Sequence, residues 1–152
     1  MKTWQILLYG KMFLDFLLQF FNSDNEIRTK AEESISQLLQ HDPKSFCTNL
    51  FLILQNSTQL PPVVIRFALL LLKKIYKRAS IACQSGSDSF SYRLISLEET
   101  QNMIPLIISF FGNSSIDIQN ESSYLLGQIS IYFVLQPLEK SNIELLLLLI
   151  TN

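Results

Sequence analysis

Side chains that commonly carry out chemistry are few in this chain, and their spacing does not assemble a catalytic site. His41 is the single histidine, and it precedes Asp42 and Pro43, where a role in a turn or a helix cap is expected. Cys47 falls on an apolar helix face and is expected in the core, whereas Cys83 falls in a polar stretch with no charged neighbour to activate its thiol. No metal-ligand spacing, phosphate-binding glycine loop or Ser-His-Asp set is present. We therefore expect a protein without enzymatic activity, metal or cofactor.

Charged and polar side chains that recur along predicted helices are the better candidates for function. The first row is basic and comprises Arg66, Lys73, Lys74 and Lys77. The second row comprises Lys30, Glu33 and Gln37, and a weaker third row comprises Gln119 and Ser123. Such rows fit either a binding surface or ordinary solvated helix faces. Because four positive charges within three turns repel one another, the basic row favours an acidic partner.

Composition narrows the remaining possibilities. The chain has 152 residues, enough for one domain or a few repeats, and only 16% are charged, against about 25% in a typical protein. Its net charge of −1 gives no basic footprint for nucleic acid or an anionic membrane. Two cysteines far apart in sequence favour a reducing compartment over a disulfide framework. Lys11, Asp15 and Gln19 interrupt the apolar start of the chain, so a signal peptide is not expected.

Apolar residues recur at spacings of three and four, which predicts an all-α fold. The predicted helices cover residues 12–21, 23–40, 43–56, 62–78, 97–111, 116–135 and 141–152, and residues 79–96 are predicted to form a loop. Expected helix starts are the capping boxes Ser23/Glu26, Ser96/Glu99 and Ser141/Glu144, and Asp42 before Pro43. The phenylalanine-rich run 13–21 is expected to lie in the core or between paired helices.

The same periodicity predicts the buried faces. For the second helix the face is Ile27, Ala31, Ile35, Leu38 and Leu39. For the third it is Phe46, Cys47, Leu50, Phe51, Ile53 and Leu54, and for the fourth Ile65, Ala68, Leu69, Leu72, Ile75 and Tyr76. For the sixth it is Ile118, Ser122, Leu125, Ile129, Tyr132 and Phe133.

The helices fall into pairs, and the second helix of each pair begins with an apolar residue followed by a polar one. Ile27-Arg28 and Ile65-Arg66 are 38 positions apart, and Ile118-Gln119 follows 53 later. That interval becomes about 40 if the loop carries about 13 inserted residues, which is the period of HEAT or armadillo repeats. Arg28 and Arg66 are expected to pair with Asp24 or Asp117.

The predicted architecture is an α-solenoid of about three helix pairs and one unpaired C-terminal helix. Repeat 1 covers about 12–40, repeat 2 about 43–78, repeat 3 about 97–135, and a partial fourth repeat 141–152. The last helix, "NIELLLLLITN", is apolar nearly all round, although the terminal repeats of a solenoid need a polar outer face. We therefore expect the N-terminal slice of a longer array.

Several of these residues also carry a family resemblance. The segments "SDNEIRTKAEES", "HDPKSF" and "PPVVIRFALLLLKK", with Arg78 and "LISLEE" after them, resemble the N-terminal HEAT region of the importin-β (karyopherin-β) nuclear transport receptors. The branch that imports ribosomal proteins and histones is the nearest. The resemblance covers about 12–100 and fades beyond. Two departures are Leu69-Leu70, where the family commonly has a small pair, and Tyr92 or Leu94, where it has a Trp.

The resemblance implies a superhelical receptor of cytoplasm and nucleus that binds Ran-GTP through the inner helices of its N-terminal repeats. It implies that cargo proteins and nuclear-pore Phe-Gly repeats bind mostly further along. The residues that it assigns to Ran are the first two polar rows, with Lys30, Glu33 and Gln37 on one helix and Arg66, Lys73, Lys74 and Lys77 on another. One alternative is a HEAT scaffold without a transport role, such as a microtubule-binding or phosphatase-scaffold array. A more distant one is a secreted or membrane-anchored helical protein.

Overall fold

The computed structural model describes residues 13–85, 97–135 and 147–151, and every element in these ranges is helical. The longer helices are α2 (Asn25–His41), α3 (Pro43–Gln55), α4 (Pro62–Ser85), α6 (Leu97–Ser109) and α7 (Ile116–Leu135). Short 3₁₀ helices are η1 (Gln19–Phe21), η2 (Ser57–Gln59) and η3 (Phe110–Gly112). Residues 13–18 and 147–151 are also helical. The predicted all-α class is confirmed for the described residues.

Two aspartates begin successive helices. Asp42 caps α3 by accepting a hydrogen bond from the Ser45 N–H at 3.2 Å, with Pro43 in the first helical turn, as predicted. The predicted Ser23 cap is wrong, because Asp24 caps α2 and accepts from the Glu26 N–H at 2.8 Å. A carboxylate beside the helix N-terminus also interacts favourably with the helix dipole. The predicted caps at Ser96 and Ser141 lie outside the described residues.

α4 is longer than its sequence pattern predicted. It continues to Ser85, so the prediction of a loop from residue 79 is wrong for 79–85. Ala79 and Ala82 are buried and extend the apolar row that Ile75 and Tyr76 begin. Alanine favours a helix but adds little hydrophobicity, so this part of the stripe was hidden in a polar-looking segment. Consequently Cys83 is a half-buried helical residue and not a loop residue.

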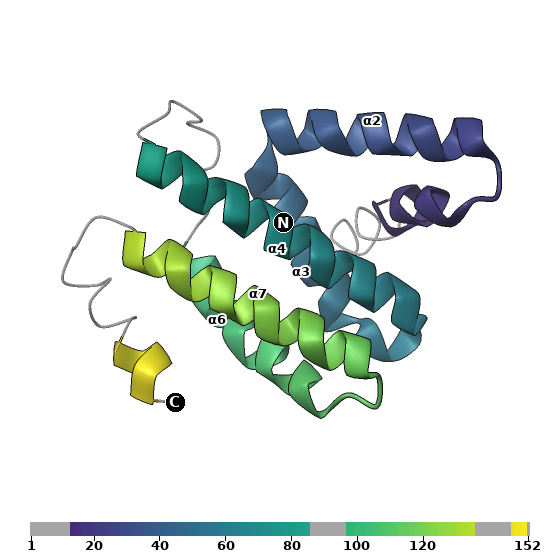
Figure 1. Ribbon diagram of the computed structural model, residues 1–152. Helices are drawn as coiled ribbons and strands as arrows, with labels where there is room; N and C mark the ends of the chain where they lie inside the picture. Colours follow the sequence, from purple (N-terminus) through teal and green to yellow (C-terminus); the bar gives the residue numbers. More distant parts are fainter. Residues whose placement is uncertain (1–12, 86–96, 136–146, 152) are drawn as a thin grey trace, which may run out of the picture.

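The core is built by two layers of helices. α4 and α7 pack extensively and run side by side in the same direction, while α3 packs on α4 and α6 packs on α7 (Figure 1). α3 also contacts α6. The predicted faces of α3, α4 and α7 are all buried, which confirms them. At about 1.5–3 kcal/mol for each large apolar side chain, these faces supply the main stabilisation of the fold.

The phenylalanine-rich start of the described chain packs onto α3 and α4. Phe13 meets Phe46 edge-on with ring centroids 5.0 Å apart, and Phe20 lies 4.9 Å from Phe67. Leu17, between them, is fully buried. The prediction that this run lies in the core or between helices is confirmed for the described residues.

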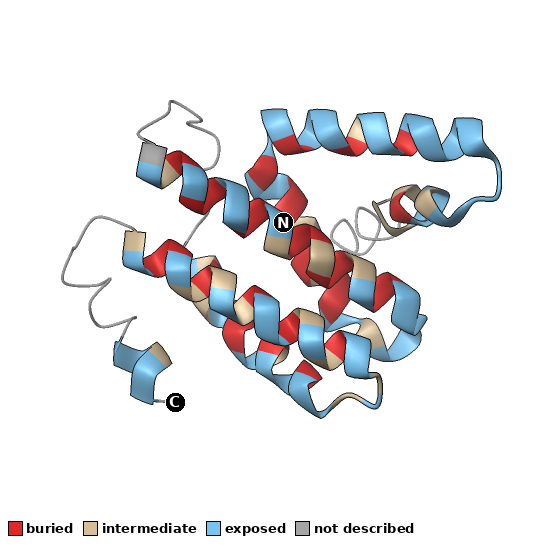
Figure 2. Cartoon of the chain, in the orientation of Figure 1, coloured by how far each residue is buried: buried red, intermediate tan, exposed pale blue. Residues whose placement is uncertain are grey.

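α2 contributes only a narrow stripe to the core. Ala31, Ile35 and Leu39 are buried, but Ile27 and Leu38 are 37% and 41% exposed, so their predicted burial is wrong. The helix packs on η1 and α3 through this single row, and most of its surface faces solvent (Figure 2). Leu38 lies off that row, and Ile27 lies on its poorly covered N-terminal end. Within the described ranges, no helix combines the length and apolar character needed to cross a membrane.

Candidate protein-binding groove

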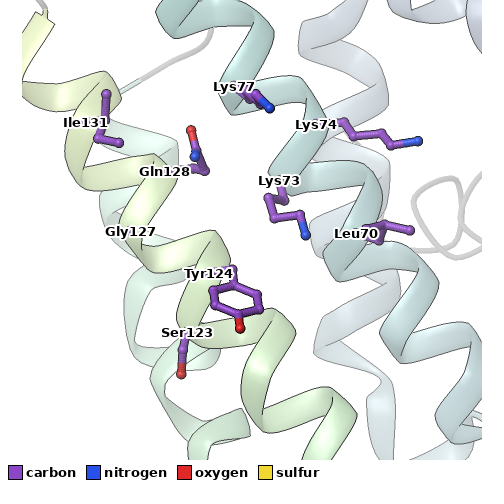
Figure 3. A pocket seen from close by; sticks show the side chains of 9 residues that line it. All are labelled: Leu70, Lys73, Lys74, Lys77, Ser123, Tyr124, Gly127, Gln128 and Ile131. Carbon is purple, nitrogen blue, oxygen red and sulfur yellow. The ribbon is translucent and has the colours of Figure 1, made fainter.

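The exposed faces of α4 and α7 form a groove of about 590 Å³ (Figure 3). Its lining comprises Leu70, Lys73, Lys74 and Lys77 from α4, and Ser123, Tyr124, Gly127, Gln128 and Ile131 from α7. Six of these nine residues are exposed and the other three are half-buried. An open groove of this kind suits a segment of another protein better than an enclosed small molecule.

The groove follows from the way that each helix uses its faces. α4 turns Ile65, Leu69 and Leu72 inward, so residues one position later along the helix face outward. α7 turns Leu125 and Ile129 inward, which leaves Tyr124 59% exposed and Ile131 45% exposed. Side-by-side packing of the two helices therefore places a lysine rim beside an aromatic and aliphatic one.

Lys73 is the least exposed of the three lysines that line the groove, and it is engaged within the chain. Its Nζ lies 3.0 Å from Oε2 of Glu121 and 5.4 Å from the centroid of the Tyr124 ring. The side chains of Lys73 and Glu121 are only 27% and 14% exposed. A pair shielded to this degree is screened less by salt than a surface pair. The Lys73 charge is thus already neutralised by α7.

Arg66 makes a second link between the same helices. Its guanidinium lies 3.7 Å from Oδ2 of Asp117, and both side chains are more than half exposed. This is one of the predicted arginine–aspartate pairs. The corresponding pair for Arg28 is not formed: Arg28 takes part in none of the three ion pairs among the described residues. The Asp24 carboxylate caps α2 instead.

Lys74 and Lys77 differ from the other two cations of the predicted basic row. Both are exposed, and no carboxylate of the described residues lies within 4.0 Å of either ammonium group. Both line the α4 side of the groove, where the Lys74 side chain points away from α7 (Figure 3). Of the four cations predicted as one row, α7 therefore neutralises two and leaves two available to a partner.

The polar row on α2 is not part of the groove. Lys30, Glu33 and Gln37 are all exposed, and Lys30 pairs with Glu26 one turn earlier at 3.3 Å. α2 makes its main contacts with η1 and α3 and runs apart from α7 (Figure 1). The structure thus brings the α4 row beside Ser123 of the third row and leaves the α2 row separate.

Sequence reasoning missed most of the α7 side of the groove. Tyr124, Gly127 and Ile131 recur at three- and four-residue intervals on the outer face of a helix whose inner face is also apolar. Apolar residues on both faces of a helix were the available signal.

A buried polar cluster between α3, α4 and α6 is the other concentration of chemical groups. The Cys47 thiol contacts the Tyr76 hydroxyl at 3.8 Å, and the same hydroxyl shares a hydrogen bond with Thr100. Burial raises the pKa of Cys47 to about 12, so its thiol stays protonated and unreactive at neutral pH. Burial also raises the pKa of Tyr76. Among the described residues there is no group of three metal-ligating side chains.

Comparisons with protein families, curated proteins and solved structures give no match to this chain.

Proposed function

We propose that the chain is a non-enzymatic protein-interaction module built from HEAT or armadillo-like helix pairs. The pair α3–α4 lies against the pair α6–α7, with α3 on α6 and α4 beside α7. Successive repeats of a solenoid stack in this manner, first helix on first and second on second. The repeated Ile65-Arg66 and Ile118-Gln119 starts of α4 and α7 support the same arrangement.

The proposed role is that of a karyopherin-β nuclear transport receptor, acting in cytoplasm and nucleus, whose second helices bind Ran-GTP. The observation that carries it is the groove between two such helices, with Lys74 and Lys77 exposed on its rim. Desolvating these cations is offset only by a partner that brings carboxylates or phosphates to them. Cargo proteins and nuclear-pore Phe-Gly repeats would bind elsewhere in a full-length receptor.

A helical-repeat scaffold without a transport role is the second candidate. Leu70 favours it, because this residue departs from the small pair of the karyopherin pattern and lines the groove. An apolar side chain at that position alters the surface that would meet Ran.

The two functions are separated by comparing the affinity of the chain for Ran loaded with a non-hydrolysable GTP analogue and for Ran loaded with GDP. Calorimetry with the 152-residue chain is expected to give binding at least about tenfold tighter for the GTP form. Binding of neither form, or equal binding of both, would leave the scaffold function and exclude the transport role for this chain.

The structure also determines which variants to test. Lys73→Glu would place a carboxylate beside Glu121 and disturb the fold, so it is a poor probe of binding. Lys74→Glu/Lys77→Glu reverses two exposed charges that have no carboxylate partner among the described residues. Lys44→Glu is the matched control, since Lys44 is exposed on α3 outside the groove.

A further inference from the structure

Gly127 is a residue that the fold itself does not explain. It lies in the interior of α7, where glycine lowers helix stability relative to alanine. A Cβ atom built at this position would meet nothing within 4 Å, so packing of α7 against its neighbours does not require the missing side chain. What the glycine does provide is a low point on the outer face of the helix, inside the groove.

The side chains around Gly127 have a definite chemical order. Tyr124 and Ile131 are exposed apolar residues one turn before and one turn after it. Lys74 and Lys77 form the opposite rim on α4. The groove therefore offers apolar side chains and a close-approach point along α7. Along α4 it offers two positive charges that pair with no carboxylate of the described residues.

We propose that this groove binds an acidic amphipathic α-helix of a partner protein, which crosses α7 at Gly127. Apolar side chains two turns apart on the partner pack against Tyr124 and Ile131, and its carboxylates face Lys74 and Lys77. Helix-in-groove recognition uses apolar anchors at such spacings. A helix backbone approaches closely where the facing residue has no side chain.

This occupant follows from charge complementarity. A basic helix would meet two cations that pair with no carboxylate of the described residues, and a purely apolar strand or helix would leave their charge beside a desolvated surface. Only an occupant that is apolar on one side and acidic on the other satisfies both halves of the groove. The inference shares the α4–α7 face with the proposed function, but it does not require that the partner be Ran.

The probe is a fluorescent helical peptide of about five turns with leucines at i, i+4, i+7 and i+11 and glutamates on the flanks. Two control peptides carry lysine in place of the glutamates, or alanine in place of the leucines. Fluorescence anisotropy with the full chain is expected to detect the first peptide, with affinity about tenfold or more above either control. Equal binding of all three peptides, or binding of none, overturns the proposal.

Two variants of the chain then locate the site. Gly127→Leu fills the close-approach point with a side chain whose Cβ meets no atom within 4 Å, and it is expected to weaken peptide binding about tenfold or more. Gly112→Leu is its matched control, because a Cβ at Gly112 also meets nothing within 4 Å and the residue lies outside the groove. Lys74→Glu/Lys77→Glu is expected to weaken binding by a similar factor, and Lys44→Glu to leave it unchanged. Circular dichroism melting of each variant establishes that it is folded.

The remaining outcomes are equally decisive. Peptide binding that neither groove variant weakens overturns the proposed site. Self-association of the chain that Gly127→Leu abolishes would assign the groove to a second copy and overturn the proposed occupant. If the chain binds the peptide but not GTP-loaded Ran, only the proposed function is contradicted. If it binds GTP-loaded Ran but not the peptide, only this inference is contradicted.

Discussion

Lys73 and Glu121 join α4 to α7 through an ion pair of 3.0 Å, and the Tyr124 ring covers the same ammonium group. The two residues are 48 positions apart in the sequence, and both are largely shielded from solvent. This contact fixes the register of the two helices that form the groove. It also decides which lysines of the basic row remain available.

The Lys73–Glu121 pair is expected to contribute measurably to stability. Lys73→Met keeps the aliphatic stem but leaves Glu121, which is 14% exposed, without its cation. An unpaired acceptor at this depth costs about 1–3 kcal/mol. We therefore expect the free energy of unfolding in urea to fall by about 1–2 kcal/mol. Lys77→Met, which removes an exposed lysine that pairs with no carboxylate of the described residues, is the control, and an equal loss in both variants would contradict the role of the pair.

Ser80 is expected to be a weak point of α4. Its hydroxyl oxygen is buried and has no hydrogen-bond partner among the described residues. Ser80→Ala removes the unsatisfied group and improves helix propensity, so we expect a gain of about 1 kcal/mol in the free energy of unfolding. Ser123→Ala, at an exposed position of α7 whose hydroxyl bonds to the Gln119 carbonyl, should change stability much less. A loss of stability in Ser80→Ala would show that the hydroxyl has a partner.

Gly127 is expected to limit the stability of the free chain. Gly127→Ala adds a methyl group that meets no neighbour, and alanine is favoured over glycine within a helix by about 1 kcal/mol. We expect thermal and urea unfolding to show a gain of that size. A loss instead would mean that packing around α7 requires the glycine, and would remove the argument for a partner at this position.

Stability is expected to fall at alkaline pH because of Cys47. Burial raises its pKa from 9.0 to about 12, so between these values the unfolded chain releases a proton that the folded chain retains. The unfolded state then binds fewer protons, and the free energy of unfolding decreases as pH rises, by up to about 1.4 kcal/mol per pH unit. The contribution is complete below pH 9.0 and lost toward pH 12.

Urea unfolding at about pH 8, 9 and 10 measures how the free energy of unfolding changes with pH in the parent chain and in Cys47→Ala. The variant is expected to lose stability at all three values through its cavity, but to show a smaller decrease from pH 9 to pH 10. Burial also raises the pKa of Tyr76 above its ordinary value of 10.0, so Tyr76 lowers the free energy of unfolding only above about pH 10. Identical slopes in both proteins would contradict the assignment to Cys47.

The inner faces of the helices could be predicted from sequence because they depend on local spacing. Every residue expected inward on α3, α4 and α7 is buried, since an apolar row at helical period has one way to face the core. Two of the failed predictions also have local causes. Asp24, and not the neighbouring Ser23, caps α2. Ala79 and Ala82 were too weakly hydrophobic to indicate the last turns of α4.

The groove could be predicted only in part. Lys73, Lys74 and Lys77 were identified from their charge, but the sequence could not divide them into paired and unpaired lysines. That division depends on which α7 residue faces each lysine, a relationship between segments 48 positions apart. Ile27 failed for the same reason, because its exposure depends on how far the neighbours of α2 extend along it.

The affinity of the chain for GTP-loaded Ran, compared between Lys74→Glu/Lys77→Glu and Lys44→Glu, tests the central claim most directly. The two variants change the same type of residue, and only the first changes the groove rim. We expect the groove variant to bind about tenfold or more weakly than the parent chain, and the control to bind equally well. Equal affinities in all three folded proteins would contradict the claim that the exposed lysines of this groove recognise the partner.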